Sequence, residues 1–250
     1  MKRLQPFWLA CALLTTLPVG PLVHTPVASR DSGRSVVCYP LVGLLIGLLV
    51  AGFAALLAGV HAGLAAVLTL AVWVALSGAL HLDGLADCTD AWFAGHRDPE
   101  RCLAVMRDPA AGPMAVVALV LLLLTKAAAL TVLVGTGDAL ALVAAPVLAR
   151  SGAAVLMATT AYRRSGGLAT AMAAWLPRRA TALAVAAVAV IGLFVVGPGR
   201  WLILLAAAIA AGAAWRGLWQ RRIGGYTGDV VGGLIECVEL AVVVAAALTV

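Results

Sequence analysis

The sequence has 250 residues, of which 64% are hydrophobic and only 11% are charged, and its mean hydropathy is +1.08. A soluble domain carries about 45–50% apolar and about 25% charged residues, so the composition excludes an ordinary soluble protein. The net charge is +6, but no basic patch interleaved with aromatic residues accompanies it, so we expect no nucleic-acid partner.

Long apolar runs predict an all-α fold, a polytopic integral membrane helical bundle of about seven transmembrane helices, within a single domain over residues 1–250. The apolar stretch 7–17 is too short to cross a bilayer and is expected to form an N-terminal interfacial or re-entrant helix. The predicted spans are 39–59, 62–80, 114–134, 138–159, 180–197, 201–217 and 230–250.

The basic residues lie almost entirely on one side of these spans. With the N-terminus placed inside, the outer turns hold only Arg200, while Lys126 and Arg150 fall within spans. The other fourteen are Lys2, Arg3, Arg30, Arg34, Arg97, Arg101, Arg107, Arg163, Arg164, Arg178, Arg179, Arg216, Arg221 and Arg222. The positive-inside rule therefore predicts that the N-terminus and the acidic segments beside these residues face the cytoplasm.

Three aspartates follow the second predicted span, in HLDGLADCTDAW at 81–92. If this segment is helical, Asp83, Asp87 and Asp90 share one face because their offsets are four and seven residues. Neighbouring carboxylates about 5.5 Å apart repel each other by roughly 3 kcal/mol at an effective dielectric constant of 20. Mg²⁺ would neutralise them, since it prefers carboxylate oxygens. A solvated acidic loop is the alternative.

A second acidic group lies in GGYTGDVVGGLIECVEL at 224–240. Asp229 and Glu236 share a helix face, and Glu239 lies about 60° further round. Acids within a span are costly and usually functional, so we expect these three to have a functional role. Alternatively, the glycines only turn the chain and the acids reach the membrane interface. Thr227 is expected to cap the last helix.

Cations near these acids are open to two interpretations. Lys126 and Arg150 should face the bundle interior, either in an internal ion pair with Glu236 or Glu239 or around an anionic ligand. The loop 94–113 holds Arg97, Arg101 and Arg107. These arginines either bind phosphate, which arginine recognises with two parallel hydrogen bonds, or only hold the loop inside.

Five segments carry a resemblance to a known family. They are TTLPVGP near the start, YPLVGLLIG at 39–47, GALHLDGLADCTDAW at 78–92, RCLAVMRDPAAGPMAVVAL at 101–119 and GGYTGDVVGGLIECVEL at 224–240. In this order and spacing the sequence resembles the cobalamin synthase family, the adenosylcobinamide-GDP ribazoletransferases. The resemblance implies Mg²⁺-dependent joining of adenosylcobinamide-GDP to α-ribazole or its 5′-phosphate, with release of GMP, in the bacterial cytoplasmic (inner) membrane.

The resemblance also implies roles for single residues. Asp83, Asp87 and Asp90 match the family's first acidic motif and are expected to be catalytic and to bind metal. Beyond the resemblance, we assign the base for the acceptor hydroxyl to one of these carboxylates, Asp90. Asp229, Glu236 and Glu239 match the second acidic motif as metal ligands. Substrate or cofactor contacts are expected from Arg97, Arg101, Arg107, Lys126 and Thr227.

The sequence departs from the family pattern at two places. Ala91 and Trp92 follow Asp90 where the family has Asp-Gly, and residues 107–110 read Arg-Asp-Pro-Ala where Lys-Asp-Ser-Arg is common. The second departure removes polar groups that the family's loop could offer to a nucleotide.

Two other functions fit part of the pattern. A CDP-alcohol phosphotransferase also uses membrane aspartates and metals, but Asp87 stands where its motif has arginine. An ion-coupled transporter would carry cations on intramembrane acids, yet the sequence has no internal repeat. Among partners we expect membrane lipid, and the bundle is compatible with a homo-oligomer.

Overall fold

The computed structural model describes residues 4–95, 98–164 and 168–250. This part of the chain forms helices and no strand. The α-helices are α1 (Gln5–Leu14), α2 (Ser29–Ser35), α3 (Tyr39–Leu56), α4 (Ala62–Ser77), α5 (Leu80–Ala94), α6 (Pro99–Val105), α7 (Pro113–Gly135), α8 (Ala139–Thr159), α9 (Leu168–Trp175), α10 (Arg178–Val195), α11 (Pro198–Ile223) and α12 (Gly228–Ala247). Two short 3₁₀ turns, η2 (Gly20–Leu22) and η3 (Val36–Cys38), complete the helical elements.

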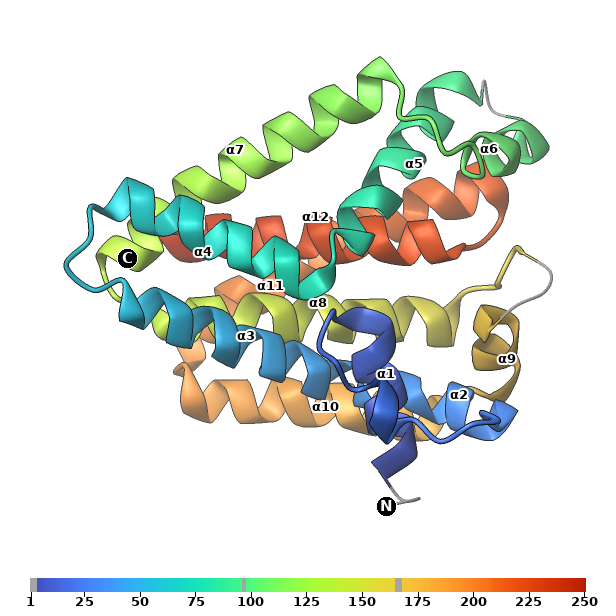
Figure 1. Cartoon of the computed structure of the whole chain (residues 1–250), viewed down its shortest axis with the longest axis horizontal. Helices are drawn as coiled ribbons and strands as arrows, with labels where there is room; N and C mark the ends of the chain where they lie inside the picture. Colours follow the sequence, from blue (N-terminus) through green and yellow to red (C-terminus); the bar gives the residue numbers. More distant parts are fainter. Residues whose placement is uncertain (1–3, 96–97, 165–167) are drawn as a thin grey trace.

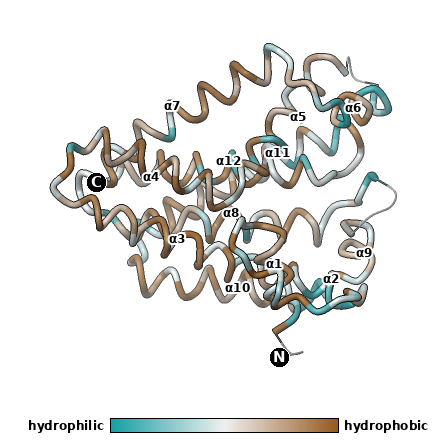
Figure 2. The backbone as a smooth tube through the Cα atoms, viewed as in Figure 1, coloured by the Kyte–Doolittle hydropathy of each residue, from teal (hydrophilic) through white to brown (hydrophobic). Residues whose placement is uncertain are grey.

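Length and composition confirm the polytopic membrane bundle. Within the described residues six helical segments are long and apolar enough to cross a membrane, and the bent pair α4–α5 makes a seventh if it counts as one span. Figure 1 shows α3, α4, α8, α10 and α12 running in a common direction, with α7 tilted and α5 turned away from them. The helix bodies are hydrophobic, whereas hydrophilic segments gather at the end that holds α2 and α6 (Figure 2). We call this the basic end, and the end with the short α3–α4 and α7–α8 turns the opposite end.

The second predicted span is broken, which the sequence did not indicate. Gly78 and Ala79 are both left-handed, with φ of 62° and 57°, and α5 leaves α4 at an angle of 86°. The break frees backbone carbonyls that a membrane cannot hydrate. Thr16 satisfies them, because its hydroxyl donates to the carbonyl of Ala75 and its backbone N–H to that of Leu76, both at 2.8 Å. The segment after α1 thus covers the break.

Two helices form the centre of the bundle, and small residues bring α3 against one of them. The residues of α8 and α12 are mostly buried, whereas those of α10 and α11 are mostly exposed. A Cβ atom at Gly43 or Gly47 would lie 2.5 or 2.7 Å from the backbone of α8 at Pro146 and Val143. Such close approach maximises van der Waals contact between membrane helices.

The shorter helices gather at the basic end. The ten-residue apolar α1 confirms the predicted short N-terminal helix, and it packs against α2 and α3. α2 in turn packs against α9. At the opposite end Arg200 forms an ion pair with Asp138, which caps α8. The single cation predicted for the outer turns therefore has a carboxylate partner.

Candidate active site

The first acidic group forms the predicted helix face on α5. Asp83 is exposed, and Asp87 and Asp90 are half-buried. All three point along one side of a helix that starts only after the break at Gly78 and Ala79. Because of the break, α5 runs from the interior of the bundle to the basic end, where α6 follows (Figure 1).

Two glycines bring this face against the start of α12. A Cβ atom at Gly84 would lie 2.8 Å from the carbonyl oxygen of Asp229, and one at Gly232 would lie 3.3 Å from Cα of His81. The two helices therefore pack backbone to backbone. Asp87 lies close enough to Asp229, and to the other two acids of α5, to interact with them electrostatically. Four carboxylates from two helices thus form one cluster, which we call the aspartate cluster: Asp83, Asp87, Asp90 and Asp229.

Gly84→Ala is expected to push α5 away from α12, because the added methyl would meet backbone rather than a movable side chain. Overpacking of this kind costs about 1–3 kcal/mol, which thermal unfolding in mild detergent would report as a lower midpoint. The matched control is Gly52→Ala in α3, where an added Cβ meets nothing within 4 Å. Equal midpoints for both variants would contradict the close contact.

Arg164 adds a cation to the aspartate cluster. Its guanidinium lies 2.7 Å from Oδ2 of Asp229 and donates to the carbonyl of Met106 at 3.1 Å. The sequence offers Arg164 only as one of a group of basic residues that either set the orientation or bind phosphate. Nothing in its local sequence separates it from Arg163, so its place in the site depends on a tertiary contact.

That contact is a short backbone pairing between two loops. The N–H of Tyr226 donates to the carbonyl of Ala161, and the N–H of Arg163 donates to that of Tyr226, both at 2.9 Å. The rings of Tyr162 and Tyr226 lie 5.3 Å apart. Burial raises the pKa of Tyr162, and it raises that of Tyr226 to about 12, so both phenols stay protonated. The pairing therefore holds Arg164, the next residue along the chain, beside the start of α12.

Thr227 caps α12, as predicted. Its hydroxyl oxygen accepts from the N–H of Val230 at 3.3 Å and lies 3.2 Å from Oδ2 of Asp229. The side chain is fully buried. Thr227 therefore orients Asp229 as well as starting the helix.

Asp90 has a second partner, the start of α7. Its carboxylate accepts from the N–H of Gly112 at 2.6 Å and from that of Ala115 at 3.1 Å. These are N–H groups of a helix N-terminus, which favours a negative charge. Asp90 therefore joins α5 to α7. Its assignment as the general base stays a prediction.

The segment predicted as a loop after α5 contains the short helix α6, and the structure describes two of its three arginines. Arg101 and Arg107 are exposed, and neither takes part in an ion pair in the described part of the chain. Arg97 lies outside the described residues. Phosphate binding by these three arginines stays a prediction.

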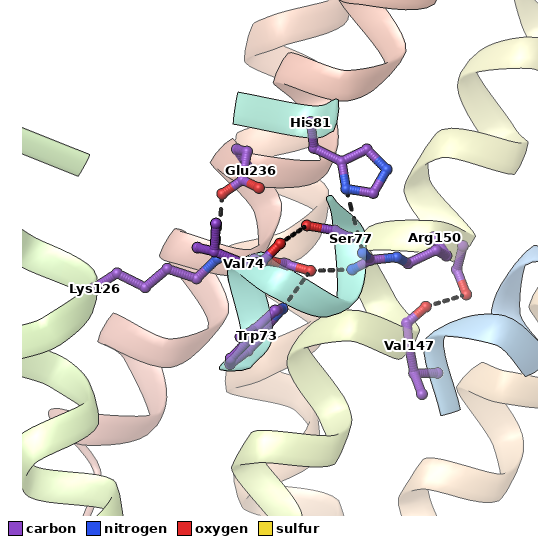
Figure 3. Close-up of polar contacts among 10 residues, drawn as sticks. Trp73, Val74, Ser77, His81, Lys126, Val147, Arg150 and Glu236 are labelled. Atoms are coloured by element: carbon purple, nitrogen blue, oxygen red, sulfur yellow. Dashed lines mark hydrogen bonds and ion pairs between the residues drawn. The ribbon is translucent and has the colours of Figure 1, made fainter. Parts of the chain in front are cut away.

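The second acidic group divides between two places. Asp229 belongs to the aspartate cluster, whereas Glu236 and Glu239 lie deeper along α12 in a buried charge network (Figure 3). Lys126 of α7 lies 3.2 Å from Glu236 and 2.5 Å from Glu239. Arg150 of α8 forms an ion pair with Glu239. Of the two interpretations of Lys126 and Arg150, an internal ion pair or an anionic ligand, the structure shows the internal ion pair.

Neutral groups complete this network. The indole of Trp73 donates to Glu239 at 3.2 Å, and Nδ1 of His81 lies 3.4 Å from Arg150. Two cations and two anions, all nearly inaccessible to solvent, thus bind α4, α5, α7 and α8 to α12. Buried ions need such partners, since an unpaired charge is very costly in an apolar interior. Metal binding by Glu236 and Glu239 stays a prediction.

The departure at Ala91 and Trp92 has a packing role. Ala91 is fully buried, and its carbonyl accepts from Sγ of Cys102 at 3.5 Å. The ring of Trp92 meets that of Trp219 edge to face and lies under the guanidinium of Arg222, 4.2 Å from the ring centroid. These residues fix the end of α5 to α6 and α11.

These features define a polytopic helical membrane protein with clustered carboxylates at one end of the bundle. The family model of cobalamin-5-phosphate synthase matches residues 6–247. The chain therefore belongs to the cobalamin-5-phosphate synthase family, which confirms the resemblance drawn from the motifs.

Curated relatives match over nearly their whole length. An adenosylcobinamide-GDP ribazoletransferase of Pseudomonas putida (strain F1) is 50% identical over 244 residues, which are 97% of this chain and 98% of the relative. Proteins of the same name from Pseudomonas entomophila and Stutzerimonas stutzeri are 49% and 48% identical, over 98% of this chain and 99% and 98% of their own. The relatives are thus named as transferases. The comparison with solved structures found no match.

Proposed function

We propose that the chain is an adenosylcobinamide-GDP ribazoletransferase, which joins adenosylcobinamide-GDP to α-ribazole or its 5′-phosphate and releases GMP. The observation that supports this most is the aspartate cluster, formed where α5 meets α12 in a chain of this family. Group transfer at phosphorus needs little beyond positioning and neutralisation of charge on the phosphate oxygens, and the cluster and its arginine are suited to both.

The residues present are compatible with Mg²⁺. Every donor of the aspartate cluster is a carboxylate oxygen, the ligand that Mg²⁺ prefers, and Mg²⁺ is usually held by one or two carboxylates while water and substrate phosphate complete its shell. Among the described residues no group of three His, Cys, Asp or Glu is arranged to hold a metal ion by itself, so the site would need ligands from water and substrate. We propose that two carboxylates of the cluster, Asp83 and Asp229, hold Mg²⁺, and that water and substrate phosphate complete its shell. When bound, the ion would neutralise charge on the transferring phosphate.

Two side chains of the site would act on the substrates directly. The acceptor 5′-hydroxyl attacks the phosphorus that carries the cobinamide side, its proton passes to a carboxylate, and the bond to GMP breaks. We propose Asp87 as that base in place of Asp90, because Asp90 already accepts two N–H groups of α7. Arg164, held beside Asp229, would contact a phosphate oxygen through its guanidinium.

We further propose that the basic end faces the cytoplasm of a bacterium, with the chain in the inner membrane. The distribution of Lys and Arg supports this orientation, as does the position of the aspartate cluster at the end where soluble nucleotides would arrive. The Arg200–Asp138 ion pair would then lie at the outer face.

The decisive assay uses the purified protein in detergent with adenosylcobinamide-GDP, α-ribazole and Mg²⁺. We expect the cobalamin product and GMP in equal amounts, and neither product when Mg²⁺ is removed with a chelator. Replacing adenosylcobinamide-GDP by a CDP-alcohol should give no transfer. If cosubstrates shown to be active with a curated relative give no product here, the proposal is wrong.

A further inference from the structure

A long apolar groove lies between α8, α10 and α11, away from the aspartate cluster. Its volume is about 570 Å³, and Leu234 of α12 lines its base. Along α8 it runs from Leu148 to Thr159, and along α11 from Leu205 to Gly217. At 1.5 Å per residue, both walls are about 16–18 Å long.

This length is about half the thickness of a bilayer's hydrocarbon core, which is about 30 Å. The groove also occupies one half of the bundle, because Leu148 lies near the middle of α8 and Thr159 is its last residue, at the basic end. In a bilayer a groove of this length and position would span one leaflet, from the centre of the membrane to its surface. The two outer walls, α10 and α11, are the most exposed of the long helices.

The walls offer almost nothing to a polar ligand. The hydroxyls of Ser151 and Thr159 donate to carbonyls of their own helix, at Val147 and Val155, both at 2.8 Å. The remaining lining is aliphatic or glycine, except at one place. The groove thus suits a flexible hydrocarbon chain, which needs no hydrogen bonds.

The exception is Arg216, at the basic end of the groove. Its Nε donates to Oγ1 of Thr160 at 2.9 Å, and its Nη2 donates to the carbonyl of Thr159 at 3.1 Å. These two bonds fix the guanidinium, while the side chain stays exposed. Among the described residues no acid forms an ion pair with it. An anchored, uncompensated cation at the end of an apolar groove is complementary to an anionic head group on an acyl chain.

We propose that the groove is a binding site for an anionic phospholipid, with one acyl chain between α8, α10 and α11 and the phosphate at Arg216. Basic pockets between membrane helices bind anionic lipid head groups in this way. The site is separate from the transfer chemistry, so the proposal holds or fails independently of the proposed function.

Native mass spectrometry of the delipidated protein in detergent tests the site, with added phosphatidylglycerol or phosphatidylcholine of the same acyl composition. We expect the first phosphatidylglycerol to bind about fivefold more tightly than the first phosphatidylcholine, since one arginine near an anionic lipid contributes roughly that factor. R216Q should remove this preference. R221Q, which removes a charge from the same end of α11 outside the groove, should keep it.

A second pair of variants tests the groove itself. Gly212→Leu would fill it, because an added Cβ there meets only Val238, at 3.8 Å, and the first binding of both lipids should then be lost. If Gly212→Leu does not fold, Gly217→Leu fills the groove in its place, because an added Cβ at Gly217 meets nothing within 4 Å. The control is Gly52→Leu on the exposed face of α3.

Three results would overturn the proposal. They are equal binding of the two lipids to the wild-type protein, a preference that survives R216Q, and full lipid binding to both filled variants. A dimer that binds no lipid and dissociates on filling the groove would also overturn it, by showing that a second copy occupies the groove.

Discussion

Asp87→Asn is expected to lower the rate of transfer by about 10²–10⁴-fold, the range typical for loss of an acid–base group. Asp87 is half-buried at the centre of the aspartate cluster, where it is within electrostatic reach of the other three acids. Asparagine keeps the shape but can neither accept the proton nor neutralise a cation. Initial rates at saturating cosubstrates, with the protein at equal concentration, would measure the loss.

Stability should not fall in this variant. Removing one of several neighbouring carboxylates relieves repulsion of up to a few kcal/mol per close pair, so the thermal midpoint should stay equal or rise. Binding of Mn²⁺, followed by electron paramagnetic resonance as a substitute for Mg²⁺, should weaken. Glu100→Gln, which removes an exposed carboxylate of α6 nearby, should change neither the rate nor metal binding. A rate in Asp87→Asn within tenfold of the wild type would exclude Asp87 as the base.

Lys126→Met is expected to destabilise the bundle by about 3–5 kcal/mol, the usual cost of breaking a buried ion pair on one side. Glu236 and Glu239 would then share only Arg150, leaving one buried carboxylate without a cation. Thermal or denaturant unfolding in detergent would measure the loss. Transfer should also slow, since the network joins α5 and α12 a few residues from the aspartate cluster.

A second substitution should restore most of this stability. In the double variant Lys126→Met with Glu236→Gln, the remaining charges balance again, one carboxylate against one guanidinium. Arg200→Gln breaks a partly exposed ion pair at the opposite end and should cost less, because exposed pairs contribute less than buried ones. If the double variant were as unstable as Lys126→Met alone, charge balance would not be the reason for the network.

The sequence was informative about the helices because hydropathy alone defines membrane spans. Each predicted span corresponds to a helix, though α11 continues to Ile223, six residues beyond its predicted end. The break in the second span was not predictable: Gly78 permits a left-handed conformation, but Ala79 does not favour one. The carbonyls that the break leaves free are satisfied by Thr16, which is far away in the sequence.

The sequence predicts which residues belong to the site better than it predicts how these residues are arranged. Helical spacing was enough to place Asp83, Asp87 and Asp90 on one face. Helical spacing could not predict that Asp229 joins the aspartate cluster while Glu236 and Glu239 join the buried network. That division depends on the depth in the bundle at which Lys126 and Arg150 lie. Arg164 reaches the cluster only through the pairing of two loops, which no local pattern encodes.

The buried network also has a consequence for biosynthesis. Its cations lie on α7 and α8, and both of its anions lie on α12, which leaves the ribosome after α7 and α8. Until α12 inserts, the nascent bundle holds Lys126 and Arg150 in the membrane without their counter-ions. Insertion of α12 neutralises both at once and also delivers Asp229 to the aspartate cluster. Insertion of α12, neutralisation of the two buried cations and assembly of the aspartate cluster are thus a single step.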